Sequence, residues 1–327
     1  MELGENLFSA WPTGVSSLES KPLEQPGKAS RSWLQFVGSL LRRLLLLIAL
    51  CYLGIVCLFA TMQRWLIYSP NPAPVQPEEV RLDPALVESF QLHSEGEQLE
   101  GWYCSTQRGF GDVRRCAILF PGNAGNRGNR ASIIQQWNEL GYDVVIVDYR
   151  GYGGSSGKPS EAAFAADSRA VWDYVTQERQ FDPKDVVICG QSLGGAVGIR
   201  LVHDLETEGV RPAGLVVRAS FTSLVDAGRY HYPWLPVNLV LLDRFPSLDR
   251  ISAIQCPLLF LHGQRDTIVP FEHSSKLFAN APEASHNGVA KRLVPLPNAG
   301  HNDIMHVHGD DVTEAVRQFL SDVAAVQ

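Results

Sequence analysis

Short, largely apolar runs recur along the chain from about residue 80, and most are followed by a stretch with helical spacing. The runs lie at 116–120, 143–148, 185–190, 214–218 and 258–262, with a weaker one at 291–296. A strand that is covered on both faces reads as a continuous apolar run. Strand and helix in repeated alternation therefore predict an α/β fold, with a mainly parallel sheet and helices on both of its faces.

Helical stretches and one further pair of strands complete the expected domain. The helical stretches lie near 129–140, 160–178, 194–207, 271–280 and 310–325. Residues 87–93 and 98–105 are interpreted as an antiparallel pair at a sheet edge. We find no internal repeat and no second core, so residues 80–327 are expected to form one domain. Because ligands bind beyond the carboxyl ends of parallel strands, the functional residues should directly follow strands.

An uncharged apolar segment precedes this domain. Residues 44–62 (LLLLIALCYLGIVCLFATM) contain no charged side chain, and their length is close to the roughly 20 residues that cross a bilayer core. A core helix in a soluble domain would show a polar face, whereas this segment is apolar all round. We therefore expect a single-pass transmembrane anchor. A cleaved signal peptide competes with this interpretation, but its apolar region is usually shorter and its leading segment is not normally this long.

The segments on either side of the span are expected to be irregular. Residues 1–43 begin with a stretch rich in Gly, Ser, Pro and Glu, which predicts a flexible tail. Residues 63–79 contain SPNPAPVQPE, which predicts an extended, Pro-rich spacer that holds the domain off the membrane. Lys28, Arg31, Arg42 and Arg43 precede the span, whereas Arg64 and Arg81 follow it. This excess predicts a cytoplasmic N-terminus and a catalytic domain on the non-cytoplasmic side.

Charge and cysteine spacing exclude several kinds of partner. The net charge of −7 and the lack of a basic stripe argue against nucleic acid. The six cysteines form no CxxC pair, so a structural zinc site is not expected, and we expect no cofactor. Cys104 and Cys116 stay open as a disulfide pair in an oxidising compartment, because sequence does not fix the separation of their Cα atoms.

A G-x-S-x-G motif lies between a predicted strand and a predicted helix. Residues 190–194 read GQSLG, directly after the strand run DVVICG. A serine on such a tight turn projects its Oγ into the cleft, and the flanking glycines keep neighbouring side chains clear of it. We therefore predict Ser192 as a nucleophile. The alternative is a plain glycine-rich turn.

A serine nucleophile needs a base and an acid that orients the base. His301, in NAGHND on a turn before the last helix, has the best setting among the nine histidines for the base. Asp266, in HGQRDTIVP after a late strand, fits the orienting acid. Asp226 and Asp243, which follow the preceding strand, are the alternatives for this acid, while Asp303 lies too near His301 in the chain.

Other histidines suit the base less well. His262 ends a strand beside the acid loop and is expected to pack or to hydrogen-bond locally. His306 and His308 would have to join His301 in a metal site, but their spacing does not converge on one helix face, so we expect no metal. For the oxyanion hole we predict the backbone N–H groups of Leu193 and of Asn123, the latter in the small-residue loop PGNAGN.

These motifs together resemble those of a branch of membrane-anchored α/β-hydrolase-domain proteins. That branch carries HGNAGN, DYRGYG, GxSxGG, DxxVP and GxHND. The matching segments here are PGNAGN at 121–126, DYRGYG at 148–153, GQSLGG at 190–195, DTIVP at 266–270 and GHND at 300–303. The order Ser, Asp, His along the chain is also that of α/β-hydrolases. The resemblance implies the α/β-hydrolase fold and a serine triad, and it implies that Tyr149, Arg150 and Tyr152 shape the loop behind the nucleophile.

One departure from that family is Pro121, which stands where the family usually has His. The presumed donor, the N–H of Asn123, lies beyond it, so we expect the loop to be altered but not disabled. The resemblance implies hydrolysis of small-molecule or lipid esters or thioesters near a membrane. A serine peptidase of the same fold and a non-catalytic membrane scaffold are the competing interpretations. Residues 222–250 contain no long insertion, and their apolar side chains are expected to line an acyl pocket, touch the bilayer or simply pack on the core.

Overall fold

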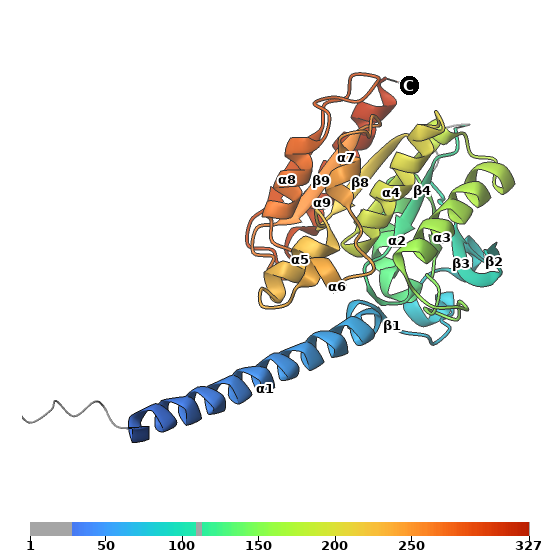
Figure 1. Ribbon diagram of the computed structural model, residues 1–327. Helices are drawn as coiled ribbons and strands as arrows, with labels where there is room; N and C mark the ends of the chain where they lie inside the picture. The colour runs from blue at the N-terminus through green and yellow to red at the C-terminus, as the bar shows by residue number, and fades with distance from the viewer. Residues whose placement is uncertain (1–27, 109–112, 327) are drawn as a thin grey trace, which may run out of the picture. The chain divides into compact units, whose positions relative to one another are not determined.

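The computed structural model describes residues 28–108 and 113–326, which are divided between Ile55 and Val56 into two compact units. The first unit contains the beginning of helix α1 (Lys28–Ile67), and the second contains the end of that helix and every following element (Figure 1).

Helix α1 carries the apolar segment that the sequence singles out. From Ser32 to Ile67 it is long and apolar enough, by length and composition, to cross a membrane. The helix is longer at both ends than the expected span of 44–62, and it includes the first residues of the expected spacer. The expected tail falls mostly on residues 1–27, which lie outside the described residues.

Within the described ranges, an eight-stranded sheet forms the centre of the second unit. Its strands are β2 (Val87–Ser94), β3 (Glu97–Cys104), β4 (Cys116–Phe120), β6 (Asp143–Val147), β7 (Val186–Gln191), β8 (Gly214–Arg218), β9 (Leu258–Gly263) and β10 (Arg292–Leu296). They lie in the order β10-β9-β8-β7-β4-β6-β3-β2, and the neighbours from β10 to β6 are parallel. The hairpin of β2 and β3 is antiparallel and sits at the edge beside β6. The expected mainly parallel sheet with an antiparallel edge pair is confirmed.

Helices cover both faces of this sheet. They are α2 (Ala131–Glu139), α3 (Glu161–Asp173), α4 (Leu193–Thr207), α5 (Leu224–His231), α6 (Val237–Val240), α7 (Ser247–Ile251), α8 (Glu272–Asn280) and α9 (Ile304–Ala324). Side chains of α3, α4 and α8 share one apolar cluster, and those of α2 and α9 share another. Along β4, Ile118 belongs to the first cluster and its neighbours Ala117 and Leu119 belong to the second. Successive side chains of a strand point to opposite faces, so a strand covered on both sides must be wholly apolar.

The segment after α1 packs on the rest of the second unit. It is therefore not the free spacer that the sequence predicted for residues 63–79. Strand β1 (Ser69–Pro70) pairs in parallel with β5 (Ala124–Gly125), inside the PGNAGN loop. Further along, the Ala73 carbonyl accepts a hydrogen bond from the Asn126 side chain (3.0 Å), and Val75 is buried. The prolines do keep the segment extended, but its backbone groups are engaged with the domain instead of with water. We refer to residues 69–77 as the strap.

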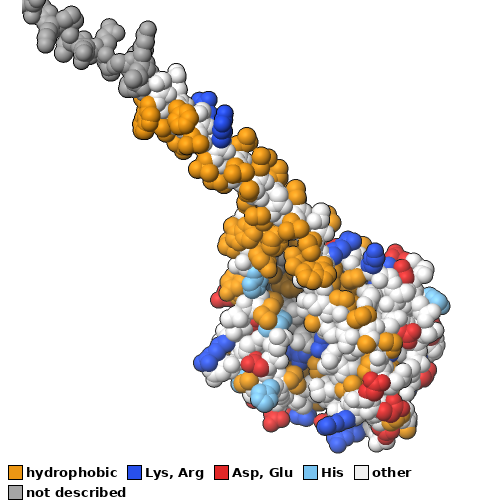
Figure 2. Space-filling view, turned by 90° about the horizontal axis from the view of Figure 1, so that it is seen from below, with side chains coloured by type: hydrophobic (Ala, Val, Ile, Leu, Met, Phe, Trp, Pro, Cys, Tyr) orange, Lys and Arg blue, Asp and Glu red, His pale blue; other side chains and the backbone are white. Residues whose placement is uncertain are grey.

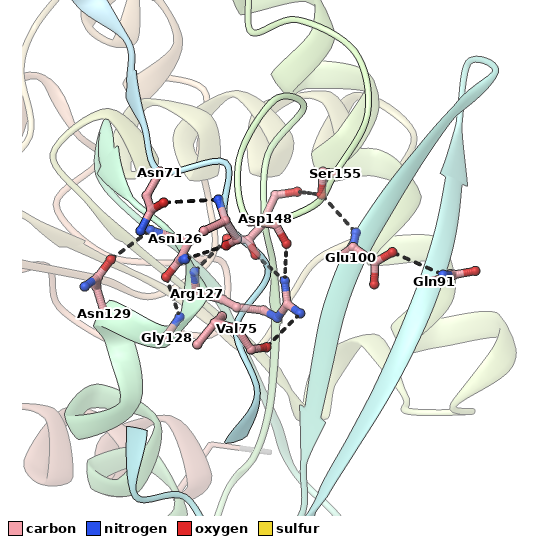
Figure 3. Close-up of polar contacts among 12 residues, drawn as sticks. Asn71, Val75, Gln91, Glu100, Asn126, Arg127, Gly128, Asn129, Asp148 and Ser155 are labelled. Carbon is pink, nitrogen blue, oxygen red and sulfur yellow. Dashed lines mark hydrogen bonds and ion pairs between the residues drawn. The ribbon is translucent and has the colours of Figure 1, made fainter. Parts of the chain in front are cut away.

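A buried ion pair holds the strap, the PGNAGN loop and the DYRGYG loop together (Figure 3). The Arg127 guanidinium donates to the Asp148 carboxylate and to the Gly153 carbonyl (2.9 Å), and the Arg127 backbone N–H also donates to Asp148 (2.6 Å). The same guanidinium lies over the Trp102 ring, 4.8 Å from its centroid. Both charged residues are buried: Arg127 is 4% exposed and Asp148 is 1% exposed.

Two cysteines that sequence left open as a pair are free and buried. Cys104 ends β3 and Cys116 begins β4, and β6 lies between these two strands. Strands two places apart are separated by about 9–10 Å, which exceeds the Cα separation of a disulfide. Burial raises the pKa of the Cys104 thiol to about 12, so it stays protonated and packs as a small apolar group.

Residues 222–250 form the short helices α5, α6 and α7, which the sequence analysis did not assign. Helices this short are marginal by themselves and form because tertiary contacts support them. The last helix, α9, begins at Ile304, before the expected start at 310, and its backbone is non-helical at His308 (φ −135°).

We predict that Asp148→Asn lowers the free energy of unfolding by about 3–5 kcal/mol, because it leaves the buried charge of Arg127 without its partner. Denaturant titration in detergent micelles measures this change. The matched control is Glu314→Gln, which removes one partner of the exposed Glu314–Arg317 pair on α9 and should leave stability unchanged within error. Equal stability of both variants would contradict the structural role given to the buried pair.

Candidate active site

Ser192 occupies the sharp turn between β7 and α4. Its backbone lies in a positive-φ conformation (φ 52°, ψ −117°), which non-glycine residues rarely adopt. The glycines around it permit the close packing of this turn. A Cβ on Gly190 would lie 2.2 Å from the carbonyl oxygen of Gly194, and one on Gly194 would lie 2.0 Å from the carbonyl oxygen of Phe120. The turn therefore needs glycine at both positions, as the motif predicts.

The structure brings the three predicted catalytic side chains into one hydrogen-bonded chain. His301 Nε2 lies 3.0 Å from Ser192 Oγ, and His301 Nδ1 lies 2.6 Å from Asp266 Oδ2. Each side chain follows the carboxyl end of a strand: Ser192 follows β7, Asp266 follows β9, and His301 follows β10. Because these strands run parallel to one another in one sheet, the loops that follow them meet at the same edge.

Asp266 is held as a carboxylate by several donors. The backbone N–H groups of Ile268 and Val269 donate to its Oδ1 at 2.9 and 2.7 Å. Burial alone would raise the pKa of this carboxyl, but hydrogen bonds from His262 and His301 outweigh burial and lower the pKa below its ordinary value. Asp266 is therefore ionised at neutral pH and can accept the N–H of the His301 ring.

His262 is a neighbour of this site whose contact with the acid the sequence analysis missed. Its fully buried ring lies with Nε2 3.2 Å from Asp266 Oδ2 and 2.7 Å from the Val269 carbonyl oxygen, while Nδ1 lies 2.6 Å from Ser274 Oγ. The expectation of local hydrogen bonding agrees with these contacts. The available signal was its position at the end of β9, four residues before Asp266.

The residues considered as alternatives for the acid and the base make contacts outside the hydrogen-bonded chain. Asp226 accepts hydrogen bonds from Thr222 and Ser223 at the start of α5, and Asp243 accepts from Arg64 and Tyr68. Asp303 accepts from the Gly300 N–H, and His308 contacts Asp311. Across the part of the chain that the structure describes, no group of three or more His, Cys, Asp or Glu side chains could hold a metal ion.

The PGNAGN loop runs beside Ser192. A Cβ on Gly122 would lie 3.6 Å from the Ser192 Cβ, and Asn123 lines the same cavity as the serine. Leu193 is the first residue of α4, so its backbone N–H lacks an acceptor within the helix. Leu193 directly follows Ser192 and Asn123 lines the same cavity, and the role of their N–H groups in an oxyanion hole stays a prediction.

Tyrosines of the DYRGYG loop support the PGNAGN loop. Tyr149 donates from its hydroxyl to the Pro121 carbonyl (3.1 Å), and Tyr152 donates to the Asn123 carbonyl (2.8 Å). These contacts agree with the role that the resemblance implies for both tyrosines. Arg150 anchors the DYRGYG loop on another side, because its guanidinium binds Asp167 at 2.7 Å. Its part in shaping the loop stays a prediction.

A cavity of about 730 Å³ opens at Ser192 and His301. One wall comes from α5, α6 and the residues between them, including Leu224, Leu235 and Val237. The apolar segment 222–250 is therefore divided between the cavity wall and the protein surface, where Leu239 and Leu242 are exposed.

Comparison with known proteins places the chain among α/β hydrolases. Residues 111–247 match the family described as "Serine aminopeptidase, S33". An uncharacterised protein of Mycobacterium tuberculosis is 38% identical over 281 residues, which cover 86% of this chain and 95% of that protein.

Two further comparisons involve proteins whose names state an activity. The lysophosphatidylserine lipase ABHD12 of Danio rerio is 33% identical over 214 residues, which cover 61% of this chain and 55% of that protein. An esterase of Pyrococcus furiosus superposes with a TM-score of 0.62 at 18% identity, covering 78% of this chain and 97% of the esterase. At that identity the likeness concerns the fold.

We predict that Asp266→Asn lowers kcat by about 10⁴, because the amide no longer holds the His301 tautomer that accepts a proton at Nε2. Asp226→Asn is the matched control, since this carboxylate accepts hydrogen bonds outside the site, and it should keep most of the activity. Steady-state kinetics with an activated ester measures both. Exchanged phenotypes would place the orienting acid after β8 instead of β9.

Proposed function

The chain belongs to the α/β-hydrolase superfamily, and from this premise we propose that it is a membrane-anchored serine hydrolase of carboxylic esters or thioesters. The observation that carries the proposal is the hydrogen-bonded chain from Ser192 through His301 to Asp266 at the wall of an apolar cavity.

The mechanism begins at the Ser192 hydroxyl. His301 Nε2 takes the proton as Oγ attacks the acyl carbon, and Asp266 stabilises the imidazolium that forms. The backbone N–H groups of Leu193 and Asn123 donate to the oxyanion of the tetrahedral intermediate. Its collapse breaks the bond to the leaving group, which takes the proton from His301. Water then attacks the acyl-enzyme with His301 again as the base, and the acid is released.

The cavity and the relatives support the proposed substrate class. The cavity wall is largely aliphatic and aromatic, which suits an acyl chain. A related lipase is named for lysophosphatidylserine, and the structural neighbour is named an esterase. Both names support an acyl or lipid ester as the substrate here.

Two other functions compete with this proposal. The matching family description names a serine aminopeptidase, which favours testing peptides alongside esters. A scaffold without catalysis would retain the fold but would not react with an active-site-directed fluorophosphonate.

Pro121, which stands where the resembling family has His, does not by itself favour the scaffold. Its carbonyl accepts a hydrogen bond from the Tyr149 hydroxyl, so the loop is braced with proline at this position.

We predict that the wild-type chain is labelled by a fluorophosphonate and hydrolyses p-nitrophenyl esters faster than p-nitroanilide peptides. Ser192→Ala should abolish both labelling and hydrolysis, with kcat lower by about 10⁴–10⁶, while circular dichroism stays unchanged. Retention of more than a tenth of the ester activity in Ser192→Ala would rule out the proposed nucleophile. A preference for peptides in the wild type would favour the peptidase.

We also propose that α1 anchors the chain in a membrane, with the N-terminus in the cytoplasm. The apolar length of α1 supports a single span, and the basic residues before 44–62 support a cytoplasmic N-terminus. We predict that the full chain stays in the membrane pellet after carbonate extraction, and that a reporter fused to its C-terminus reads as non-cytoplasmic. Extraction into the supernatant would contradict the anchor, and a cytoplasmic reporter signal would reverse the orientation.

A further inference from the structure

The end of α1 lines the cavity that contains Ser192. Phe59, Gln63, Leu66 and Ile67 all belong to the second unit, together with the serine, and all contribute to the cavity wall. They lie on about the last three turns of the helix. The segment that leads out of the expected membrane span is thus also a wall of the candidate active site.

Specific contacts fix this part of α1 to the end of α6 and to the residues that follow it. The Gln63 side chain donates to the Val240 carbonyl (3.1 Å) and accepts from the Leu242 N–H (2.7 Å). Arg64 binds the largely buried Asp243 carboxylate at 3.0 Å. Because the Gln63 amide donates from its nitrogen and accepts at its oxygen, the two hydrogen bonds fix how α1 lies against this segment.

Aromatic and aliphatic contacts extend the same attachment toward the membrane span. The Phe59 ring lies 5.7 Å from the rings of Tyr232 and Trp234, in edge-to-face geometry. Val56 is buried in a cluster with Val225 and Leu235 of the segment that carries α5 and the turn after it. Edge-to-face rings and buried aliphatic groups add to stability beyond the polar contacts.

The helix end also contacts the PGNAGN loop. The Asn123 side-chain amide donates to the Ile67 carbonyl at 2.8 Å, and the Ser69 N–H donates to the Asn123 carbonyl at 3.0 Å. Asn123 is the residue whose backbone N–H is proposed to bind the oxyanion. The end of α1 and the first residue of the strap therefore hold both sides of this residue.

Exposed apolar side chains surround the same end of the helix. Leu239 is 86% exposed and Leu242 is 67% exposed, and Trp65, Tyr230 and Trp234 are at least half exposed. Figure 2 shows hydrophobic side chains gathered on the second unit where α1 ends. A group of large apolar side chains on a soluble surface marks an interaction site. Here it is continuous with a segment that is long and apolar enough to cross a membrane, so the bilayer surface is the occupant that fits.

We propose that the last turns of α1 are part of the active site and form the acyl-chain wall, so that the substrate is a lipid with a long apolar chain that enters from the bilayer. This inference rests on the proposed hydrolase function and names its substrate class. Phe59 lies within the uncharged run 44–62, and Leu66 lies about 6 Å beyond the end of that run along the helix. A cavity with these walls opens at the membrane surface, where an acyl chain can pass between lipid and protein with little exposure to water.

The experiment uses the full chain in lipid nanodiscs and p-nitrophenyl esters from acetate to dodecanoate. Leu66→Trp narrows the cavity and should lower kcat/KM for the dodecanoate at least tenfold, while kcat/KM for the acetate changes less than twofold. Phe59→Ala removes part of the wall and should raise KM for the dodecanoate several-fold with kcat nearly unchanged. Met62→Trp is the matched control on the same helix and should keep the wild-type chain-length profile, because Met62 is 41% exposed and is not among the cavity-lining residues.

Labelling by a small fluorophosphonate distinguishes the possible failures. All three variants should label at the wild-type rate, which shows that each is folded and has an intact serine. Chain-length profiles for Leu66→Trp and Phe59→Ala that match the wild type, with labelling retained, would overturn the acyl wall and leave the hydrolase proposal standing. Loss of acetate hydrolysis or of labelling in Leu66→Trp would also overturn it, because the helix would then act on the catalytic groups and not on chain selection. A wild-type chain that neither labels nor hydrolyses any ester would overturn the proposed function itself.

Discussion

Ser192 sits in a positive-φ backbone conformation, and the neighbouring structure has to hold it there. Such a conformation costs on the order of 1–3 kcal/mol in a non-glycine residue. The Ser192 N–H donates to the Arg218 carbonyl (2.8 Å), and its carbonyl accepts from the Ser220 hydroxyl (2.8 Å). Arg218 is the last residue of β8, the strand beside β7, and Ser220 lies just after it, while Gly194 packs directly on the end of β4. The central strands of the sheet thus impose the turn, and the turn aims the hydroxyl at His301.

The same sheet explains which features could be predicted from sequence. Strands buried on both faces are continuous apolar runs, so β4 and β8 have the boundaries that the pattern predicts. Parallel order then brings the residues after β7, β9 and β10 to one edge, which is why Ser192, Asp266 and His301 could be chosen by their place after strands.

Features that depend on pairing between distant segments could not be predicted in this way. The strap has the composition of a free linker, and its pairing with β5 arises from a loop more than fifty residues away. The Arg127–Asp148 pair and the contact of His262 with Asp266 leave no periodic signal. The attachment of α1 to α6 through Gln63 is of the same kind, because a polar residue after an apolar span reads equally well as the start of a spacer.

The central claim is that Ser192 carries the acyl group during hydrolysis, and trapping that intermediate tests it most directly. The wild-type chain is mixed with a long-chain p-nitrophenyl ester, quenched in acid during turnover, digested and analysed by mass spectrometry. We predict an acyl group on the peptide that contains Ser192, formed at a rate no slower than turnover. An acyl group on another residue, or steady hydrolysis with Ser192 unmodified and no intermediate, would contradict the account.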